Sequence, residues 1–253
     1  GKHVVIEKPM ALTVADCDKI LAAAEKCGRQ CVVISQLRYS DSVRWTKSAV
    51  QKGQLGRPVF CGLYMKYYRS PEYYAQSSWR GTWAMDGGGA LMNQGIHGVD
   101  LMLGVMGPVK NVSARAAALV HPIETEDTFA AVLEFENGAF GVIEATTSVF
   151  PGYPRRMDIC GSRGSISMEE DRLVRCDGLE SPNLEMTNAS SGFADPKAIS
   201  YTGHRRQFDD FARAVEEKRS PEYTALEARQ TIQLICAAYQ AARTGRTIKI
   251  TKG

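Results

Sequence analysis

Two short segments far apart in the chain carry side chains that can move a proton. Lys8 is the middle residue of Glu7-Lys8-Pro9, which directly follows the short, mostly apolar run at residues 3–6. Asn93 and His97 follow three consecutive glycines at 87–89, and their spacing of four residues puts them on one face of an expected helix. An amine, an amide and an imidazole that converge on one pocket are suited to proton exchange with a hydroxyl or carbonyl group.

The elements expected around Lys8 place it where ligands are commonly held. The pattern predicts a short buried strand at residues 3–6, a helix from residue 13 that stops at Gly28, and a second buried strand at 31–34. A strand, a helix and a strand in this order favour the last crossover of a parallel sheet. Lys8 would then lie at the carboxyl end of a strand, where open α/β sheets bind their ligands.

After residue 35 the pattern becomes that of a mostly antiparallel sheet flanked by helices. Asn137-Gly138 is the sharpest hairpin signal in the chain. The strands around it carry apolar residues at both parities, which predicts that neither face of the sheet is fully exposed to water. We expect helices at 41–51, 89–106, 205–218 and 225–244, strands at 58–69, 109–119, 125–135, 139–149, 155–161, 165–168 and 247–250, and a long loop at 177–200.

These motifs, in this order, resemble the Gfo/Idh/MocA oxidoreductases. The family's strand-EKP signature matches residues 1–9, and its glycine-rich D/N-x-x-x-H-x-x-D signature matches residues 87–100. The resemblance spans almost the whole chain, since further family features match residues 36–39, 79–81 and 244–246. It implies an α/β plus α+β fold, in which the tail end of a Rossmann-type parallel sheet precedes an open-faced, mostly antiparallel sheet flanked by helices.

The resemblance also implies two domains and a missing part. Residues 1–34 would be the carboxyl-terminal remnant of the dinucleotide-binding domain, and residues 35–253 a substrate-binding and dimerisation domain. No G-x-G-x-x-G fingerprint follows any expected strand. We therefore expect this chain to be the carboxyl-terminal portion of a longer protein that lacks roughly 100 residues of nucleotide-binding half. On its own it should be inactive and bind the dinucleotide weakly.

The resemblance implies NAD or NADP as the cofactor and assigns roles to single residues. Lys8, Asn93 and His97 would be catalytic, and Asp100 is within reach to orient the His97 ring. Family members often have a cis peptide bond before Pro9. The expected cofactor contacts are Glu7, Lys8, Pro9, Arg38, Trp79 and Arg80, and the expected substrate contacts are Lys66, Asn93, Tyr153 and His204.

Asn93 departs from the family's commoner aspartate. An amide can hold a hydroxyl group but cannot accept its proton, so either Lys8 or His97 would be the base. The free amide groups after Gly87–Gly89 could receive an anion. The favoured interpretation is that these glycines merely allow close approach to the cofactor.

Three functions remain open at this point. The first is an NAD(P)-dependent oxidoreductase that transfers a hydride between nicotinamide and a ring hydroxyl of a sugar, nucleotide sugar or cyclitol. The second is an NAD-dependent glycosidase that oxidises its sugar transiently. The third is a non-catalytic dimerisation or binding module. In the family the open sheet face packs against another subunit, which implies a homodimer or homotetramer.

Charge, hydropathy and cysteine spacing argue against nucleic-acid binding, a membrane span and a metal site. The net charge of +3 over 253 residues gives no general affinity for polyanions. The basic clusters Arg155-Arg156 and 204–206 lack the signals of nucleic-acid binding and are more typical of solvated or substrate-facing surface. No apolar run is long enough to span a membrane. Seven scattered cysteines without a C-x-x-C pair favour reduced thiols in the cytoplasm, and no ligand spacing predicts a metal site.

Overall fold

The computed structural model describes residues 1–180, 182 and 201–251. Its amino-terminal part is a small parallel unit, in which β1 (Val4–Ile6) pairs in parallel with β2 (Cys31–Val33) and α1 (Val14–Lys26) connects them. The helix begins where the Thr13 hydroxyl accepts the amide of Asp16, and it ends just before Gly28. The predicted crossover is confirmed.

The rest of the chain is built on one eight-stranded sheet. Its strand order is β10-β4-β5-β6-β3-β7-β8-β9, and every neighbouring pair is antiparallel except β3 with β6. The strands are β3 (Pro58–Lys66), β4 (Val109–Ala117), β5 (Thr128–Phe135), β6 (Phe140–Thr146), β7 (Arg156–Gly161), β8 (Ser165–Glu169), β9 (Arg172–Asp177) and β10 (Ile248–Lys249). The predicted fold class, a short parallel sheet followed by a mostly antiparallel one, is therefore confirmed.

The hairpin between β5 and β6 forms where Asn137-Gly138 predicts it. Gly138 has φ +84°, a value that a residue with a Cβ rarely adopts, and the Asn137 side chain accepts the amide of Ala139. This turn sets the register in which Val132 faces Val142. Register decides which side chains reach the core, because neighbouring residues of a strand point to opposite faces.

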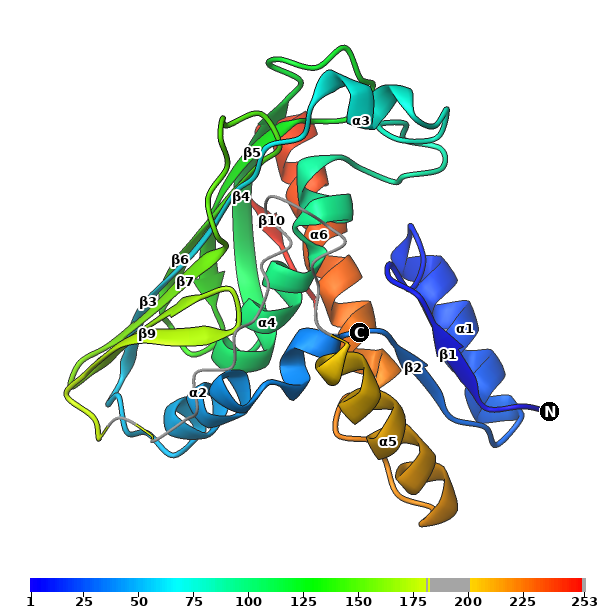
Figure 1. Cartoon of the computed structure of the whole chain (residues 1–253), viewed down its shortest axis with the longest axis vertical. Helices are drawn as coiled ribbons and strands as arrows, with labels where there is room; N and C mark the ends of the chain where they lie inside the picture. The colour runs from blue at the N-terminus through cyan, green and yellow to red at the C-terminus, as the bar shows by residue number, and fades with distance from the viewer. Residues whose placement is uncertain (181, 183–200, 252–253) are drawn as a thin grey trace.

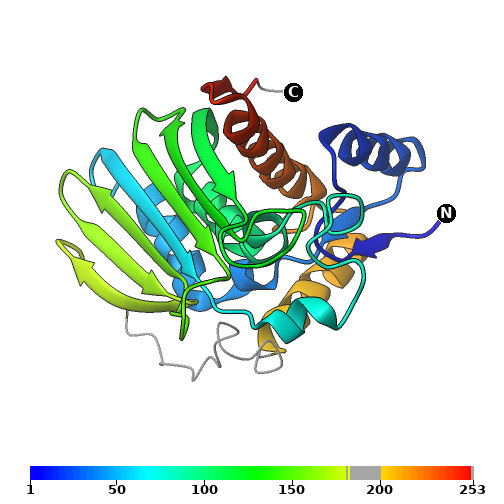
Figure 2. The same cartoon turned by 90° about the horizontal axis from the view of Figure 1, so that it is seen from above.

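Helices cover one face of the large sheet (Figures 1 and 2). They are α2 (Asp41–Gln51), α4 (Ile96–Met106) and α6 (Ala225–Thr244). The inward residues of β5, such as Phe129 and Leu133, are buried against them, whereas the outward Val132 is 56% exposed. The opposite face carries no helix among the described residues, so its apolar side chains remain exposed.

The small parallel unit lies beyond α6 from the large sheet (Figure 2), and α1 packs against α6. Helix α5 (Thr202–Glu216) also contacts the small parallel unit. Its residue Gln207 accepts the amide of Ser35 and donates to the carbonyl oxygen of Val33. The end of β2 is thus joined to the carboxyl-terminal part of the chain.

Some predicted elements differ from the structure. The single helix expected at 89–106 is interrupted at Gly95, which separates the π-helical turn η2 (Ala90–Gln94) from α4. A Cβ at Gly95 would lie 2.8 Å from the Leu91 carbonyl oxygen, so this close passage needs glycine. Strand β9 and the short helix α3 (Pro71–Ala75) were not expected, and the predicted loop at 177–200 falls mostly outside the described residues. No helix of the described part is long and apolar enough to cross a membrane.

Candidate active site

Lys8 reaches from the end of β1 to the glycine-rich segment that leads into α4. Its ammonium group donates a hydrogen bond of 2.8 Å to the backbone carbonyl of Asn93. The Lys8–Pro9 peptide bond is cis, as the family resemblance implies. Glu7 is exposed, and its carboxylate accepts the backbone amide of Lys8. The predicted meeting of the two motifs is therefore present in the structure.

A carboxylate that was not predicted completes this contact. Asp86 is 8% exposed, and it accepts hydrogen bonds from the Asn93 side-chain amide at 2.5 Å and from the Gly81 backbone amide at 2.9 Å. Burial lowers the pKa of Lys8, and the nearby charges of Asp86 and Glu7 oppose this shift. Burial likewise raises the pKa of Asp86 against the opposing hydrogen bonds of Gly81 and Asn93. Asp86 stands immediately before the three glycines, which was the sequence signal available for it.

His97 lies in the first turn of α4 among cationic groups. Burial lowers its pKa to about 3, and the charge of Lys8 acts in the same direction. Arg155 and His204 lower the pKa further, while Asp100 raises it. The ring is therefore neutral at pH 7, and the structure brings His204, a predicted substrate contact, within electrostatic reach of His97.

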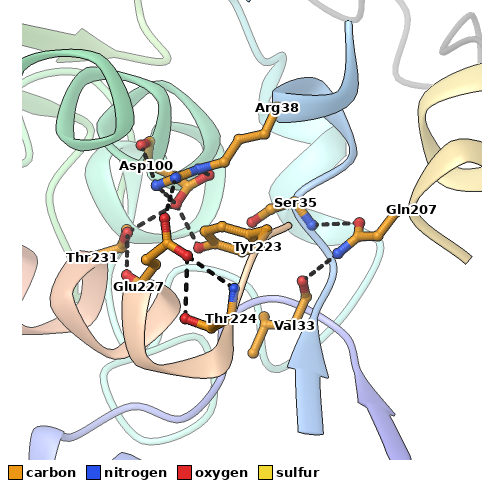
Figure 3. Close-up of polar contacts among 9 residues, drawn as sticks. All are labelled: Val33, Ser35, Arg38, Asp100, Gln207, Tyr223, Thr224, Glu227 and Thr231. Atoms are coloured by element: carbon orange, nitrogen blue, oxygen red, sulfur yellow. Dashed lines mark hydrogen bonds and ion pairs between the residues drawn. The ribbon is translucent and has the colours of Figure 1, made fainter. Parts of the chain in front are cut away.

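Asp100 does not orient the His97 ring, as the sequence had suggested. Its carboxylate, 3% exposed, instead binds Arg38 at 2.7 and 2.8 Å and accepts a hydrogen bond from Tyr223 at 2.6 Å (Figure 3). Arg38 also donates to Glu227 at 3.0 Å. These bonds occupy all three nitrogen atoms of the Arg38 side chain, so this buried residue ties α4 to α6.

The tryptophan and arginine predicted at the cofactor do lie beside this site. The Arg80 guanidinium group lies over the rings of Tyr73 and Trp79, with centroid distances of 4.4 and 5.3 Å. Its charge acts on Asp86, which places it next to the Lys8 contact. Its Nε atom is buried and makes no hydrogen bond among the described residues.

The other two predicted substrate contacts, Lys66 and Tyr153, both have side chains that are largely accessible to solvent. Lys66 forms an ion pair of 2.9 Å with Glu144, and both side chains are more than two-fifths exposed. Its neighbour Met65 is buried on the helix-covered side, so Lys66 points to the open face of the sheet and away from Lys8. Tyr153 is 53% exposed, and its backbone amide donates to the carbonyl oxygen of Lys66.

The amide groups after the glycines already hold an anion supplied by the chain itself. Glu126, 2% exposed, accepts the amides of Gly89 and Leu91 at 3.0 and 2.8 Å and the hydroxyl of Tyr239 at 2.8 Å. A Cβ on Gly89 would lie 1.8 Å from the Glu126 carbonyl oxygen. The glycine therefore allows close approach to the segment that leads into β5, and Glu126 fixes the segment that carries Asn93.

Comparison with known proteins agrees with this geometry. Residues 43–167 match the model of the GFO/IDH/MocA C-terminal domain, and residues 1–35 match the oxidoreductase family with the NAD-binding Rossmann fold. The solved structure of the WlbA dehydrogenase from Bordetella pertussis, in complex with NADH and UDP-GlcNAcA, superimposes with a TM-score of 0.87 at 31% identity. This match covers 100% of the present chain and 73% of the other.

The chain belongs to the Gfo/Idh/MocA oxidoreductase family. Another family structure, the WlbA enzyme from Chromobacterium violaceum with NADH and UDP-GlcNAcA, has a TM-score of 0.86 at 29% identity, over 99% of this chain and 71% of that one. The myo-inositol 2-dehydrogenase of Thermotoga maritima is 29% identical over 68% of this chain and 50% of its own length. The chain thus spans between half and three quarters of these three family members.

Proposed function

We propose that the protein to which this chain belongs is an NAD(P)-dependent oxidoreductase that acts on a ring hydroxyl of a nucleotide sugar. The observation that carries this proposal is the hydrogen bond between Lys8 and the Asn93 carbonyl. It joins the end of a parallel-sheet strand to the segment that leads into the His97 helix. The WlbA matches support a nucleotide sugar as substrate, and myo-inositol 2-dehydrogenase supports the wider class of ring hydroxyls.

The residues present fit a nicotinamide cofactor. One edge of β1 is unpaired among the described residues, and Val4 on this strand is 46% exposed, as suits a strand that other parallel strands would flank. Lys8 follows at the carboxyl end of this strand. The buried Nε of Arg80 offers an unused hydrogen-bond donor close by. We propose Glu7, Lys8, Pro9, Trp79 and Arg80 as the cofactor side of the site, and residues 1–34 as part of a Rossmann domain.

When bound, the nicotinamide would donate or accept a hydride. Lys8 is the group best placed to exchange the proton of the substrate hydroxyl, because burial lowers its pKa from a high value toward the working range. His97 is neutral with a pKa of about 3, so it can accept a hydrogen bond from the hydroxyl but is a weak base. The Asn93 side chain, held by Asp86, would position the substrate. We propose His204 and Tyr153 as further substrate contacts.

The proposal includes the assembly and compartment of the enzyme. The open sheet face exposes Phe60, Val132 and Phe140. An apolar centre of this kind, with ion pairs such as Lys66–Glu144 around it, suits a subunit interface of a dimer or tetramer. All seven cysteines are free, which is consistent with a reducing compartment such as the cytoplasm.

A turnover assay on the full-length enzyme tests the function. Nucleotide sugars and cyclitols are incubated with NAD or NADP, and the reduced cofactor is followed by its absorbance. Accumulation of reduced cofactor with a nucleotide sugar is expected. Release of the glycosidic group without net cofactor reduction would indicate the transient-oxidation glycosidase instead. Failure of both reactions across the panel would leave the binding-module alternative.

A further inference from the structure

Gln94 is the last residue of the π-helical turn η2 and follows Asn93 directly. Its Nε2 atom donates to the Oδ1 atom of Asn93 at 3.3 Å and to the hydroxyl of Tyr73, in α3, at 2.9 Å. Its Oε1 atom accepts a hydrogen bond of 2.8 Å from Nη2 of Arg69, which is 6% exposed and lies between β3 and α3. Gln94 therefore connects the side chain of Asn93 to a buried cation.

The hydrogen bonds of Gln94 and Asn93 form a chain with a charge at each end. Arg69 donates to Gln94, which in turn donates to Asn93. The Nδ2 atom of Asn93 then donates to Asp86 at 2.5 Å, and the other carboxylate oxygen of Asp86 accepts the amide of Gly81. An arginine can only donate hydrogen bonds, and an ionised carboxylate can only accept them. The two ends therefore fix the direction of both carboxamide groups, whose oxygen and nitrogen could otherwise exchange places.

This direction decides which atom Asn93 offers to a substrate. Its nitrogen is held by Asp86 through a short bond, whereas its oxygen has only the 3.3 Å bond from Gln94 among the described residues. A carbonyl oxygen has two lone pairs, so one acceptor position on Oδ1 stays open. The backbone carbonyl of the same residue binds the Lys8 ammonium group, so the open acceptor and this amine are held on one residue.

We propose that Gln94 is a positioning residue that keeps the oxygen of the Asn93 carboxamide available to the substrate, where it accepts the hydrogen of a ring hydroxyl. This inference rests on the proposed function, because it concerns how the same site binds a nucleotide sugar. Gln94 acts through Asn93: it donates on the oxygen side and so keeps the nitrogen on Asp86. A carboxamide turned the other way would present N–H groups to a hydroxyl that needs an acceptor.

Gln94→Glu tests this role in the full-length enzyme. It keeps the size of the side chain and the acceptor for Arg69, but its carboxylate cannot donate to Asn93. Asn93 then lies between two carboxylates and cannot satisfy both in one orientation. UDP-GlcNAcA, the ligand of the WlbA structures, is titrated by calorimetry into enzyme saturated with NADH. We expect its dissociation constant to rise about tenfold, the size of one hydrogen bond, while the NADH affinity changes far less.

The matched control is Gln233→Glu in α6. Gln233 accepts Nη1 of Arg229 at 3.0 Å and donates to the carbonyl oxygen of Thr251 at 2.8 Å. It therefore repeats the arginine–glutamine bond and the glutamine-to-carbonyl bond without a contact to Asn93. Gln233→Glu should keep the wild-type affinity for UDP-GlcNAcA.

The double variant Asp86→Asn with Gln94→Glu separates orientation from structural support. Its two new side chains can donate to the oxygen of Asn93 and accept from its nitrogen, so every group is paired again but the Asn93 carboxamide is reversed. The free energy of unfolding lost in Gln94→Glu should be largely recovered, and the double variant also serves if Gln94→Glu alone does not fold. Its dissociation constant for UDP-GlcNAcA should stay about tenfold above that of Asp86→Asn.

Recovery of both stability and affinity in the double variant would show that Gln94 is only structural, and would overturn the proposal. A double variant no more stable than Gln94→Glu would contradict the fixed direction of the chain. The proposal also falls if Gln94→Glu binds UDP-GlcNAcA as the wild type does, if Gln233→Glu weakens binding equally, or if the wild type does not bind UDP-GlcNAcA.

The proposed function can fail separately. Cofactor reduction with nucleotide sugars, together with unchanged binding in Gln94→Glu, would leave the oxidoreductase standing and remove the role of Gln94. Binding of UDP-GlcNAcA that depends on Gln94 as expected, with no cofactor reduction on any sugar, would have the opposite meaning.

Discussion

The Lys8 ammonium group and the Asn93 backbone carbonyl lie 2.8 Å apart, although 85 positions separate them in the chain. Because the acceptor is a backbone atom, the contact does not depend on which side chain stands at position 93. It fixes the amine relative to the segment that leads into α4, and hence relative to His97. The presence of Asn93 in place of the family's commoner aspartate therefore does not remove this hydrogen bond of Lys8.

Lys8→Met should lower kcat of the full-length enzyme by about 10²–10⁴-fold, the usual contribution of a positioned general acid or base. Methionine keeps most of the side-chain length and removes the exchangeable proton. Cofactor affinity should change far less, which fluorescence titration with the reduced cofactor would check. Lys2→Met, at an exposed position near the chain's start, is the matched control. A near-parental kcat in Lys8→Met would disprove the assignment.

Asp86→Asn should shift the pH profile of kcat to lower pH. The charge of Asp86 raises the pKa of Lys8 against the effect of burial, so its removal lowers that pKa further. Asparagine keeps an oxygen that can accept the Gly81 amide, which limits the structural change. If the limb of the profile that is lost in Lys8→Met does not move in Asp86→Asn, then Asp86 does not set the protonation of Lys8.

His97 should make the folded chain sensitive to acid. Its folded pKa of about 3 lies below the ordinary histidine value of 6.5, so between these values the unfolded state binds a proton that the folded state does not. Above about pH 6.5, His97 therefore does not lower the free energy of unfolding. As the pH falls below this value, the free energy of unfolding decreases by at most about 1.4 kcal/mol per pH unit. Denaturant unfolding of wild type and His97→Gln between pH 7 and pH 4 would measure it. The wild type should lose stability more steeply, and parallel curves would contradict the burial of a neutral ring.

Arg38→Met should destabilise the chain by about 3–5 kcal/mol, because it leaves the Asp100 carboxylate buried without its cation. The double variant Arg38→Met with Asp100→Leu should recover part of this loss, since both buried charges are then gone. The exposed pair Arg44–Glu222 offers the comparison, and Arg44→Met should cost much less. Thermal or urea unfolding measures all three. Equal losses of unfolding free energy in Arg38→Met and Arg44→Met would contradict the stabilising role of the buried Arg38–Asp100 ion pair.

Val132→Lys should dissociate the proposed dimer or tetramer, because it puts a charge at the centre of the open sheet face. Light scattering at tens of micromolar would report the mass. Leu226→Lys is the control, since Leu226 is 53% exposed, close to the 56% of Val132, but lies in the first turn of α6 on the helical side. A monomeric wild type, or an unchanged mass in Val132→Lys, would show that this face is not the interface.

Local patterns in the sequence were sufficient for much of the fold. The helices at 41–51 and 225–244 match their predicted limits, and the Asn137-Gly138 hairpin forms as expected. These features depend on near neighbours in the chain: caps, periodicity and glycine conformations. The ordered EKP and glycine-rich motifs likewise identified the family and two of the groups that meet, Lys8 and Asn93.

Contacts between distant segments were decided only by the tertiary structure. Periodicity placed Asp100 within reach of His97, but a buried arginine 62 positions away binds that carboxylate more strongly than a neutral ring could. The amides after Gly87–Gly89 were open in the sequence and are filled by Glu126. The surroundings of Asp86 and Lys8 also depend on which segments pack together, and burial there raises the pKa of Asp86 and lowers that of Lys8 by removing water. Such packing leaves no local pattern, which is why the sequence indicated the reacting groups but not the charges around them.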